Sequence, residues 1–216
     1  MFDNANSGII IQFVVKIHYM SETKIKHILS CKTEVSNRFV KDFKQLDSIV
    51  KMLKKMGYRI VLTQGVYDLL HEGHAQYLEN AKSQGDILIV GVDSDELTRL
   101  RKGPTRPIVP QEERIKMLAH LRHVDLIVLR ETKHQIGDLI RLVKPDVLVV
   151  SQSTTDFPKK DALEYKKSCG EIVMLPPQST TSTSARIRTL FIEGAEKLAT
   201  EINQLTQNFL ERFNKV

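Results

Sequence analysis

The chain of 216 residues is long enough for one domain of about 150 residues and an appendage. Its composition, with 41% hydrophobic and 27% charged residues, is ordinary for a soluble globular protein. The two cysteines lie far apart and neither belongs to a CxxC pair, which argues against a disulfide framework or a zinc site and favours a reducing cytoplasm. The net charge of +6 comes mainly from dispersed basic residues before residue 59, with few aromatics among them, so a solvated face is favoured over a nucleic-acid or anionic-lipid surface.

Residues 1–37 show no clear pattern and are treated as an N-terminal extension of unknown role. Their apolar run, 9–15, is shorter than the roughly 20 residues that a bilayer requires. It also lacks a basic start and a small-residue cleavage site. We therefore expect no membrane association, no signal peptide and a cytoplasmic location.

The next segment, 38–57, has apolar residues at spacings of three and four from Val40 to Met56. This spacing predicts a leading amphipathic helix that ends near Gly57.

From residue 59 onward, short apolar runs alternate with helix-like stretches. Such runs are typical of strands buried on both faces. Their alternation with helices predicts an α/β fold, a Rossmann-like doubly wound parallel five-stranded sheet with flanking N- and C-terminal helices, in one domain over 58–216. The predicted strands are 59–64, 86–92, 124–129, 146–151 and 171–175, and the predicted helices are 74–83, 110–121, 133–143 and 159–168.

A further helix is predicted at the C-terminus, where apolar residues repeat at spacings 4-3-4-3-4 from Phe191 to Phe209. Such a helix can pack on its own domain. The spacing is also heptad-like, so it can instead form the seam of a homodimer. Both alternatives stay open.

Two histidines three residues apart, His71 and His74, fall where the strand 59–64 gives way to a helix. At a helix N-terminus the free backbone N–H groups favour phosphate, and both imidazoles can face one ligand there. Gly73 between them leaves room for a phosphate close to the backbone. Metal binding is the alternative, but the spacing is HExH rather than the zincin HExxH and no third ligand is evident, so we expect no metal held by protein ligands alone.

The complete string Gly65-x-Tyr67-Asp68-x-x-His71-x-Gly73-His74 resembles the GxFDxxHxGH signature of the nucleotidyltransferases of the cytidylyltransferase superfamily. The resemblance implies transfer of a nucleotide from an NTP to a phosphorylated small molecule, with release of pyrophosphate. It implies that the two histidines stabilise the transition state and that Asp68 braces the motif turn. The nucleotide-binding residues implied here are Gly65, Val66, Tyr67, Asp68 and Gly73.

A second segment, 179–188, resembles the Ser/Thr-rich start of the last helix in this superfamily, which binds the triphosphate. Ser182, Thr183 and Ser184 are good helix N-cap residues, and their hydroxyls with the free N–H groups would form a second anion site.

A third segment, 90–114, is similar to the adenylyltransferase half of bacterial ADP-heptose synthases, which carries a VGVNSD strand end and a KGxRPxxPxxxR loop and helix. This resemblance implies that Lys102 contacts the NTP phosphates as a catalytic residue and that Asp93 and Arg114 lie at the nucleotide site. For Arg114 an ordinary position on the helix surface is the open alternative.

One turn, 151–156, departs from the KGGD pattern of the heptose enzymes because it lacks both glycines and the lysine. The expected reaction is adenylyl transfer to a sugar phosphate of the heptose 1-phosphate kind. Glycerol-3-phosphate-type cytidylyl transfer, FMN adenylyl transfer and a non-catalytic nucleotide-binding role stay open. Mg²⁺ bound mainly through the NTP phosphates is the expected cofactor.

Overall fold

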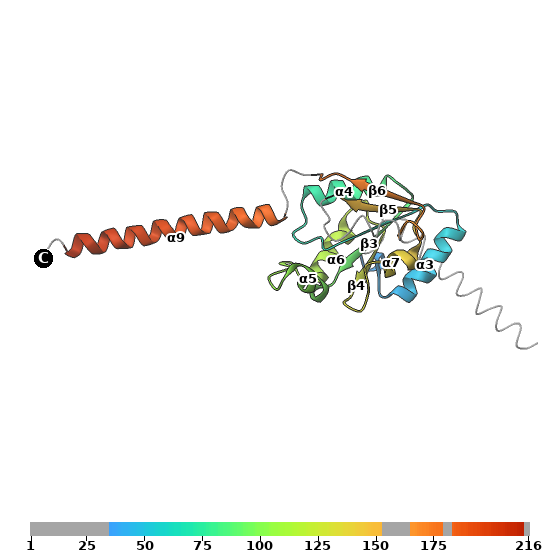
Figure 1. Cartoon of the computed structure of the whole chain (residues 1–216), viewed down its shortest axis with the longest axis horizontal. Helices are drawn as coiled ribbons and strands as arrows, with labels where there is room; N and C mark the ends of the chain where they lie inside the picture. Colours follow the sequence, from blue (N-terminus) through green and yellow to red (C-terminus); the bar gives the residue numbers. More distant parts are fainter. Residues whose placement is uncertain (1–34, 153–164, 179–182, 214–216) are drawn as a thin grey trace, which may run out of the picture. The chain divides into compact units, whose positions relative to one another are not determined.

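The computed structural model describes residues 35–152, 165–178 and 183–213. The chain divides into two compact units, Met1–Gln178 and Ser179–Val216, and each is treated by itself (Figure 1). Among the described residues, no helix is long and apolar enough to cross a membrane.

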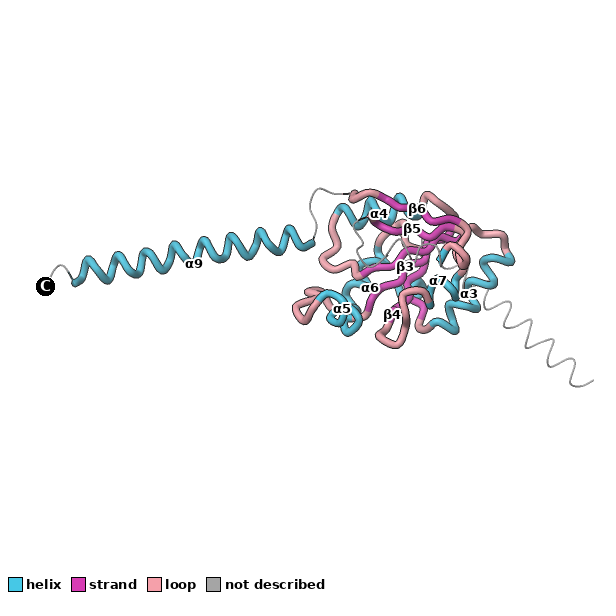
Figure 2. Tube along the Cα trace, in the orientation of Figure 1, coloured by secondary structure: helices cyan, strands magenta, loops and turns pink. Residues whose placement is uncertain are grey.

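The first unit is built on one parallel sheet of six strands in the order β1-β4-β3-β2-β5-β6 (Figure 2). The order reverses at β2, which lies between β3 and β5, so the sheet is doubly wound. The strands are β1 Phe39–Val40, β2 Ile60–Gly65, β3 Ile87–Asp93, β4 Leu126–Arg130, β5 Val147–Ser151 and β6 Glu171–Leu175.

The five predicted strands are confirmed to within two residues, but the predicted count of five is wrong. The sixth strand, β1, pairs Phe39 with Ile127 and Val40 with Val128 at the outer side of β4. Consequently the leading helix does not begin at Val40. It begins at Phe43, after Asp42 accepts the backbone N–H of Gln45 at 2.8 Å.

The other helices of this unit cover both faces of the sheet. The helix predicted over 133–143 is shorter, because 133–137 form turns, and the stretch 95–102 is a helix that was not predicted. Most of the helix predicted over 159–168 lies outside the described residues. The helices are α2 Val35–Arg38, α3 Phe43–Lys55, α4 Glu72–Lys82, α5 Asp95–Lys102, α6 Gln111–His120 and α7 Asp138–Val143.

Alternate strand residues bury their side chains in two separate cores. Leu62 and Val128 belong to the core that also contains residues of α3 and α7. Val61 and Ile127, one residue earlier on each strand, belong to the core with α4 and α6. The period of two places these helices on opposite faces of the sheet.

At the point where the strand order reverses, β2 and β5 pair over only two residues, Val61 with Val147 and Leu62 with Leu148. Beyond this point the Tyr77 hydroxyl of α4 lies between the strands. It donates to the Val149 carbonyl at 3.1 Å and is 2.8 Å from the Thr63 hydroxyl. A side chain therefore replaces part of the backbone ladder between the two strands.

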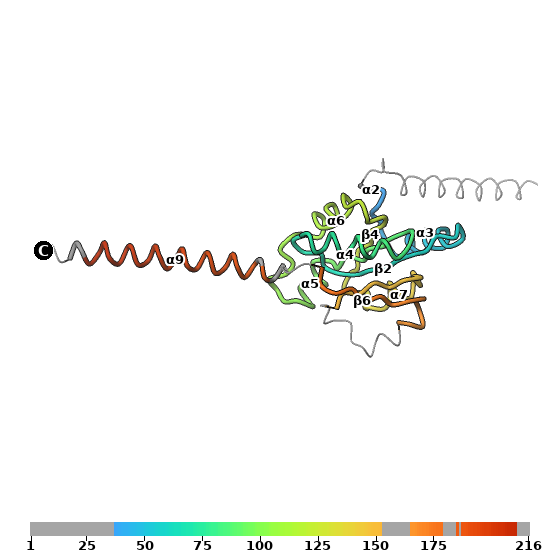
Figure 3. The backbone as a smooth tube through the Cα atoms, turned by 90° about the horizontal axis from the view of Figure 1, so that it is seen from above, coloured from blue at the N-terminus to red at the C-terminus, as the bar shows by residue number. Residues whose placement is uncertain are grey.

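The second unit contains α9, Thr183–Phe213, as one continuous helix (Figure 3). This confirms the predicted C-terminal helix and its start in the Ser/Thr-rich segment. Whether the apolar stripe of α9 packs on its own domain or forms the seam of a homodimer stays a prediction.

Candidate active site

The histidine motif forms a tight loop between β2 and α4. Tyr67 and Leu69 adopt left-handed backbone conformations, with φ of 55° and 46°, which residues other than glycine seldom do. Gly65 allows this geometry, since a Cβ there would lie 3.2 Å from the Tyr67 ring. The loop thus folds back on itself and buries the tyrosine ring.

Asp68 lies between these two residues and joins the loop to a second segment. Its carboxylate accepts the backbone N–H groups of Ile108 and Val109 at 3.0 Å each and a bond from Arg106 Nη1 at 2.8 Å. Burial alone would raise its pKa, but these donors outweigh burial, and the pKa of Asp68 is lowered. The predicted bracing of the motif turn is confirmed, while a contact of Asp68 with nucleotide stays a prediction.

His71 is the N-cap residue of α4. Its Nδ1 accepts the backbone N–H of Gly73 at 3.1 Å. An imidazole nitrogen that accepts a hydrogen bond carries no proton, so a neutral His71 holds its proton on Nε2. The Nε2–H group is therefore the donor that this residue can offer to a ligand.

His74 lies one helical turn further on, and its ring centroid is 4.1 Å from that of His71. Burial, together with the nearby His71 and Lys102, lowers the pKa of His74 to about 4, although the charge of Asp68 acts in the opposite direction. His74 is therefore neutral at pH 7, and its ring can offer hydrogen bonds but no full charge. Within the described residues its buried Nδ1 has no hydrogen-bond partner.

Lys102 is the last residue of α5 and is exposed to solvent. The helix ends at Gly103, which has a positive φ of 96°. The positive charge of Lys102 is one of the influences that lower the pKa of His74. The structure thus brings together the two predicted histidines, while the place of Lys102 in the same site and the contacts of all three residues with substrate stay a prediction.

Asp93, at the carboxyl end of β3, is 1% exposed, and both its oxygens are in ion pairs. Oδ2 accepts Arg101 Nη1 at 2.6 Å and Oδ1 accepts Arg130 Nη1 at 2.8 Å. The carboxylate thereby joins β3, β4 and α5. A bond from Asp93 to nucleotide, which stays a prediction, would compete with these pairs.

Arg114 is 1% exposed, so the alternative of a position on the helix surface is wrong. Its guanidinium donates to the carbonyls of Val66, Asp93 and Val109 and to the carboxylate of Asp95, over 2.5–2.9 Å. It therefore holds together the motif loop, the end of β3 and the start of α6. A direct contact of Arg114 with nucleotide stays a prediction.

Of the second predicted anion site, Ser182 lies outside the described residues, and Thr183 and Ser184 are the first two residues of α9. Both residues belong to the second unit, and their binding of phosphate stays a prediction.

The donor set of the histidine site favours phosphate over a directly bound metal. In the described ranges no group of three or more His, Cys, Asp or Glu residues could hold a metal ion. The nearby carboxylates of Asp68 and Asp93 are already paired with arginines. Imidazole N–H, ammonium and helix N-terminal N–H groups are what phosphoryl oxygens require.

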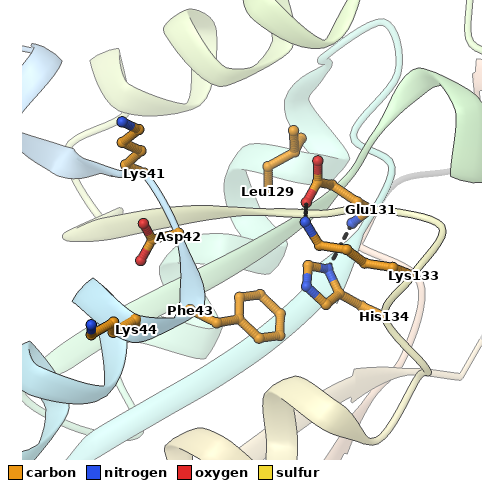
Figure 4. A pocket seen from close by; sticks show the side chains of 8 residues that line it. All are labelled: Lys41, Asp42, Phe43, Lys44, Leu129, Glu131, Lys133 and His134. Atoms are coloured by element: carbon orange, nitrogen blue, oxygen red, sulfur yellow. Dashed lines mark hydrogen bonds and ion pairs between the residues drawn. The ribbon is translucent and has the colours of Figure 1, made fainter.

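A cavity of about 270 Å³ lies at the ends of β1 and β4, lined by residues 41–44, Leu129, Glu131, Lys133 and His134 (Figure 4). Phe43 stacks on His134 with ring centroids 4.0 Å apart, and Lys133 pairs with Glu131 at 2.5 Å. Figure 4 shows Lys44 pointing away from Lys133, so the basic groups do not converge on one point. None of the predicted site residues lines this cavity.

Comparison with known proteins agrees with this geometry. Residues 62–190 match the family described as Cytidylyltransferase-like. The bifunctional protein HldE of a Nitratiruptor species is 37% identical over 190 residues, which cover 87% of this chain and 40% of that protein. The HldE of Helicobacter acinonychis (strain Sheeba) is 40% identical over 144 residues, covering 66% of this chain and 30% of that protein.

These relatives are longer, and the chain spans about 40% of the length of the HldE protein of Nitratiruptor. Among solved structures, the lipopolysaccharide core biosynthesis protein of Thermoplasma volcanium GSS1 is 30% identical, with a TM-score of 0.49 over 55% of this chain and 97% of that one. The family match covers more than half of the chain, from β2 through the histidine loop into α9. This chain therefore belongs to the cytidylyltransferase-like family of nucleotidyltransferases.

Proposed function

We propose that the chain transfers a nucleoside monophosphate from an NTP, ATP in preference, to a phosphorylated sugar of the heptose 1-phosphate kind. The observation that carries the proposal is the pair His71 and His74 at the start of α4, whose ring centroids lie 4.1 Å apart. The likeness of residues 90–114 to the adenylyltransferase half of ADP-heptose synthases, together with the HldE relatives, supports ATP and the sugar phosphate.

In this reaction an oxygen of the acceptor phosphate attacks the α-phosphorus of the NTP and forms a new P–O bond. The bond from the α-phosphorus to the α,β-bridging oxygen breaks, and pyrophosphate leaves with the electron pair. The attacking oxygen is already anionic, so no side chain has to remove a proton. The residues of the site act by positioning and by stabilising charge, which is the main requirement of phosphoryl transfer.

The individual roles follow from the hydrogen-bonding capacity of each residue. The Nε2–H group of His71 would donate to an equatorial oxygen of the α-phosphate, since its Nδ1 is engaged with Gly73. Neutral His74 would donate a second bond without requiring a proton from solvent. Lys102, exposed at the end of α5, would hold the β- and γ-phosphates and neutralise charge on the leaving group.

Mg²⁺ is proposed as the cofactor, held mainly by the NTP phosphates. When bound, it would neutralise charge on the triphosphate. The imidazole and ammonium groups of this site suit the phosphates themselves, and the nearby carboxylates are engaged with arginines.

One observation favours an acceptor other than heptose 1-phosphate. The turn 151–156 lacks the lysine and the glycines of the KGGD pattern that the heptose enzymes carry there. Glycerol 3-phosphate with CTP and flavin mononucleotide with ATP are the alternatives that the superfamily resemblance offers. The test is pyrophosphate release with ATP and CTP crossed against heptose 1-phosphate, glycerol 3-phosphate and flavin mononucleotide.

Release with ATP and heptose 1-phosphate is the expected result, and release with another pair would replace the acceptor. If the chain binds NTP in calorimetry and releases no pyrophosphate across the panel, either the altered turn 151–156 accepts another phosphate or the chain is a nucleotide-binding protein.

A further inference from the structure

Arg130, the last residue of β4, has a side chain only 3% exposed and only part of its hydrogen-bonding capacity used. Its Nη1 donates to Asp93 Oδ1 at 2.8 Å. Its Nε and Nη2 are buried and have no hydrogen-bond partner in the part of the chain that the structure describes. Buried guanidinium donors are normally satisfied, so these two groups require an explanation.

The two unpartnered nitrogens form one edge of the guanidinium plane. Two parallel N–H groups on one edge match two oxygens of a phosphate or carboxylate group. Asp93 holds the opposite part of the guanidinium and so fixes the direction in which this edge points. Arg130 therefore offers an oriented site for an anionic group.

An unpartnered acceptor belongs to a second side chain that lies near Arg130. Gln64, on β2, has a buried Oε1 that also lacks a partner within the described ranges. A Cβ added to Gly91, on the strand between, would be 3.1 Å from Arg130 Cδ and 3.4 Å from Gln64 Cγ. Both side chains thus lie over the same glycine, at the carboxyl edge of the sheet, and neither satisfies the other.

The alternation of side chains along the strands defines where Arg130 and Gln64 lie relative to the histidines. Arg130 and Gln64 follow Val128 and Leu62 by two residues each, and these two belong to the core with α3 and α7. The histidines are on α4, which covers the other face. The two groups of residues approach one sheet edge from opposite faces, and Gln64 directly precedes Gly65 of the histidine motif.

Nucleotidyl transfer requires such an arrangement, because the attacking and leaving oxygens lie roughly in line on opposite sides of the α-phosphorus. A triphosphate held on the α4 side leaves the α7 side for the acceptor. We propose that Arg130 and Gln64 form the acceptor subsite of this chain. Arg130 Nε and Nη2 donate to two oxygens of the acceptor phosphate, and Gln64 Oε1 accepts a hydroxyl of the acceptor.

The proposal rests on the proposed function for the identity of the acceptor. Both groups are covered in this structure, so an entering acceptor displaces side chains over Gly91, among which Leu139 is in closest contact. Asp93 is a positioning residue in this arrangement, since it acts on the acceptor through Arg130.

The kinetic test compares Arg130→Lys, which keeps the charge but loses the two-donor edge, with Gln64→Leu, which removes the acceptor atom and no charge. Arg38→Lys is the matched control. Arg38 directly precedes β1, at the opposite edge of the sheet, and donates to the carbonyls of three residues between α6 and β4, namely Ala119, Leu121 and Val124. We expect KM for heptose 1-phosphate to rise about tenfold or more in both test variants, with KM for ATP within about twofold of wild type. An unchanged KM for the acceptor, or an equal rise for ATP, overturns the proposal.

A second measurement does not depend on turnover. The Nε–Hε signal of Arg130 in the nitrogen–proton NMR spectrum, assigned by its loss in Arg130→Lys, is followed during titration with heptose 1-phosphate, inorganic phosphate and ATP. A shift with heptose 1-phosphate or inorganic phosphate supports the subsite, and a shift with ATP alone assigns Arg130 to the nucleotide and overturns it. If no NTP–acceptor pair releases pyrophosphate, the proposed function fails, while the response to inorganic phosphate still decides the subsite.

Circular dichroism melting shows whether Arg130→Lys folds. If it does not, Gln64→Leu and the wild-type NMR titration, with Arg130 assigned through the backbone, carry the test.

Discussion

The rings of His71 and His74 lie 4.1 Å apart and are tilted by 35°, yet the two imidazoles have different hydrogen-bond partners. Nδ1 of His71 is occupied by the N–H of Gly73, whereas Nδ1 of His74 is buried and, among the described residues, without a partner. His71 therefore also caps the helix, whereas no described residue engages Nδ1 of His74. Substitutions at the two positions should have separable effects on folding and on catalysis.

His74→Ala is expected to lower kcat by a factor of about 100 or more, as the loss of a single transition-state donor does in comparable sites. Its effect on folding should be small, because His74 Nδ1 has no partner within the described residues. Pyrophosphate release and thermal melting measure the two effects, with His123→Ala, a partly exposed histidine outside the motif, as the control. Turnover like that of wild type would remove His74 from the mechanism.

The depressed pKa of His74 predicts how stability depends on pH. The unfolded chain binds a proton at His74 below about pH 6.5, whereas the folded chain resists it down to about pH 4. The contribution of His74 to the free energy of unfolding therefore has its full value above pH 6.5 and decreases as the pH falls toward 4. One such group gives a slope of at most about 1.4 kcal/mol per pH unit.

Urea unfolding at several pH values between about 4 and 7.5 measures this slope, and His74→Gln should reduce it. An equal slope in the variant would mean that other groups account for the pH dependence.

Lys102→Met is expected to raise KM for the NTP and to leave the midpoint of thermal unfolding unchanged, because the side chain is exposed at the end of α5. Removal of the nearby positive charge should also raise the pKa of His74, since Lys102 is one of the groups that lower it. Proton NMR titration of the histidine signals measures that pKa. A pKa of His74 that does not move would place the ammonium group further from the imidazoles than proposed here.

Asp68→Asn tests the connection between the motif loop and the segment 106–109. The amide cannot accept the N–H groups of Ile108 and Val109 and pair with Arg106 at the same time. We expect a loss of about 1–3 kcal/mol in the free energy of unfolding, as for a buried group left without its partners. Equilibrium urea unfolding gives the value, and Asp47→Asn, at an exposed ion pair of α3, provides the control with a change near zero.

Arg114→Lys separates a structural role from a nucleotide contact. Lysine keeps the positive charge but cannot reproduce the four bonds that join the motif loop, β3 and α6. A buried carbonyl left without its donor costs about 1–3 kcal/mol. Thermal unfolding should therefore shift strongly downward. Kinetics below the new transition should show a smaller change in KM for ATP than Lys102→Met does, and a larger one would assign Arg114 to the nucleotide.

Much of the fold could be predicted because the inner strands are continuous apolar runs with helices between them. β1 could not, since two residues carry no periodic signal and its pairing with β4 is a long-range contact. α5 was missed because its eight residues are mostly polar, although Ser94 accepts the Leu97 N–H at 3.1 Å as an N-cap. The serine followed by Asp95 and Glu96 is the local signal that could have identified this helix.

For the site, the motif and the strand before it were enough to place the histidines at a helix start, and the family resemblance supplied the bracing role of Asp68. The partners of Asp68 and Asp93 were not predictable, because Arg106 and Arg130 are about 40 residues away along the chain. Arg130 in particular follows an ordinary apolar strand, and only the three-dimensional pairing shows its unpartnered edge.

The hydroxyl of Tyr77 between β2 and β5 has a consequence for how sequences of this family can diverge. Two strands that separate after two paired residues leave a buried carbonyl, Val149, whose hydrogen bond comes from a side chain. Burial raises the pKa of Tyr77 to about 12, so the phenol remains a donor at any physiological pH. Homologues with an apolar residue at this helix position should therefore have β2 and β5 paired over a longer stretch, and the separation of the two strand ends should vary together with that single residue.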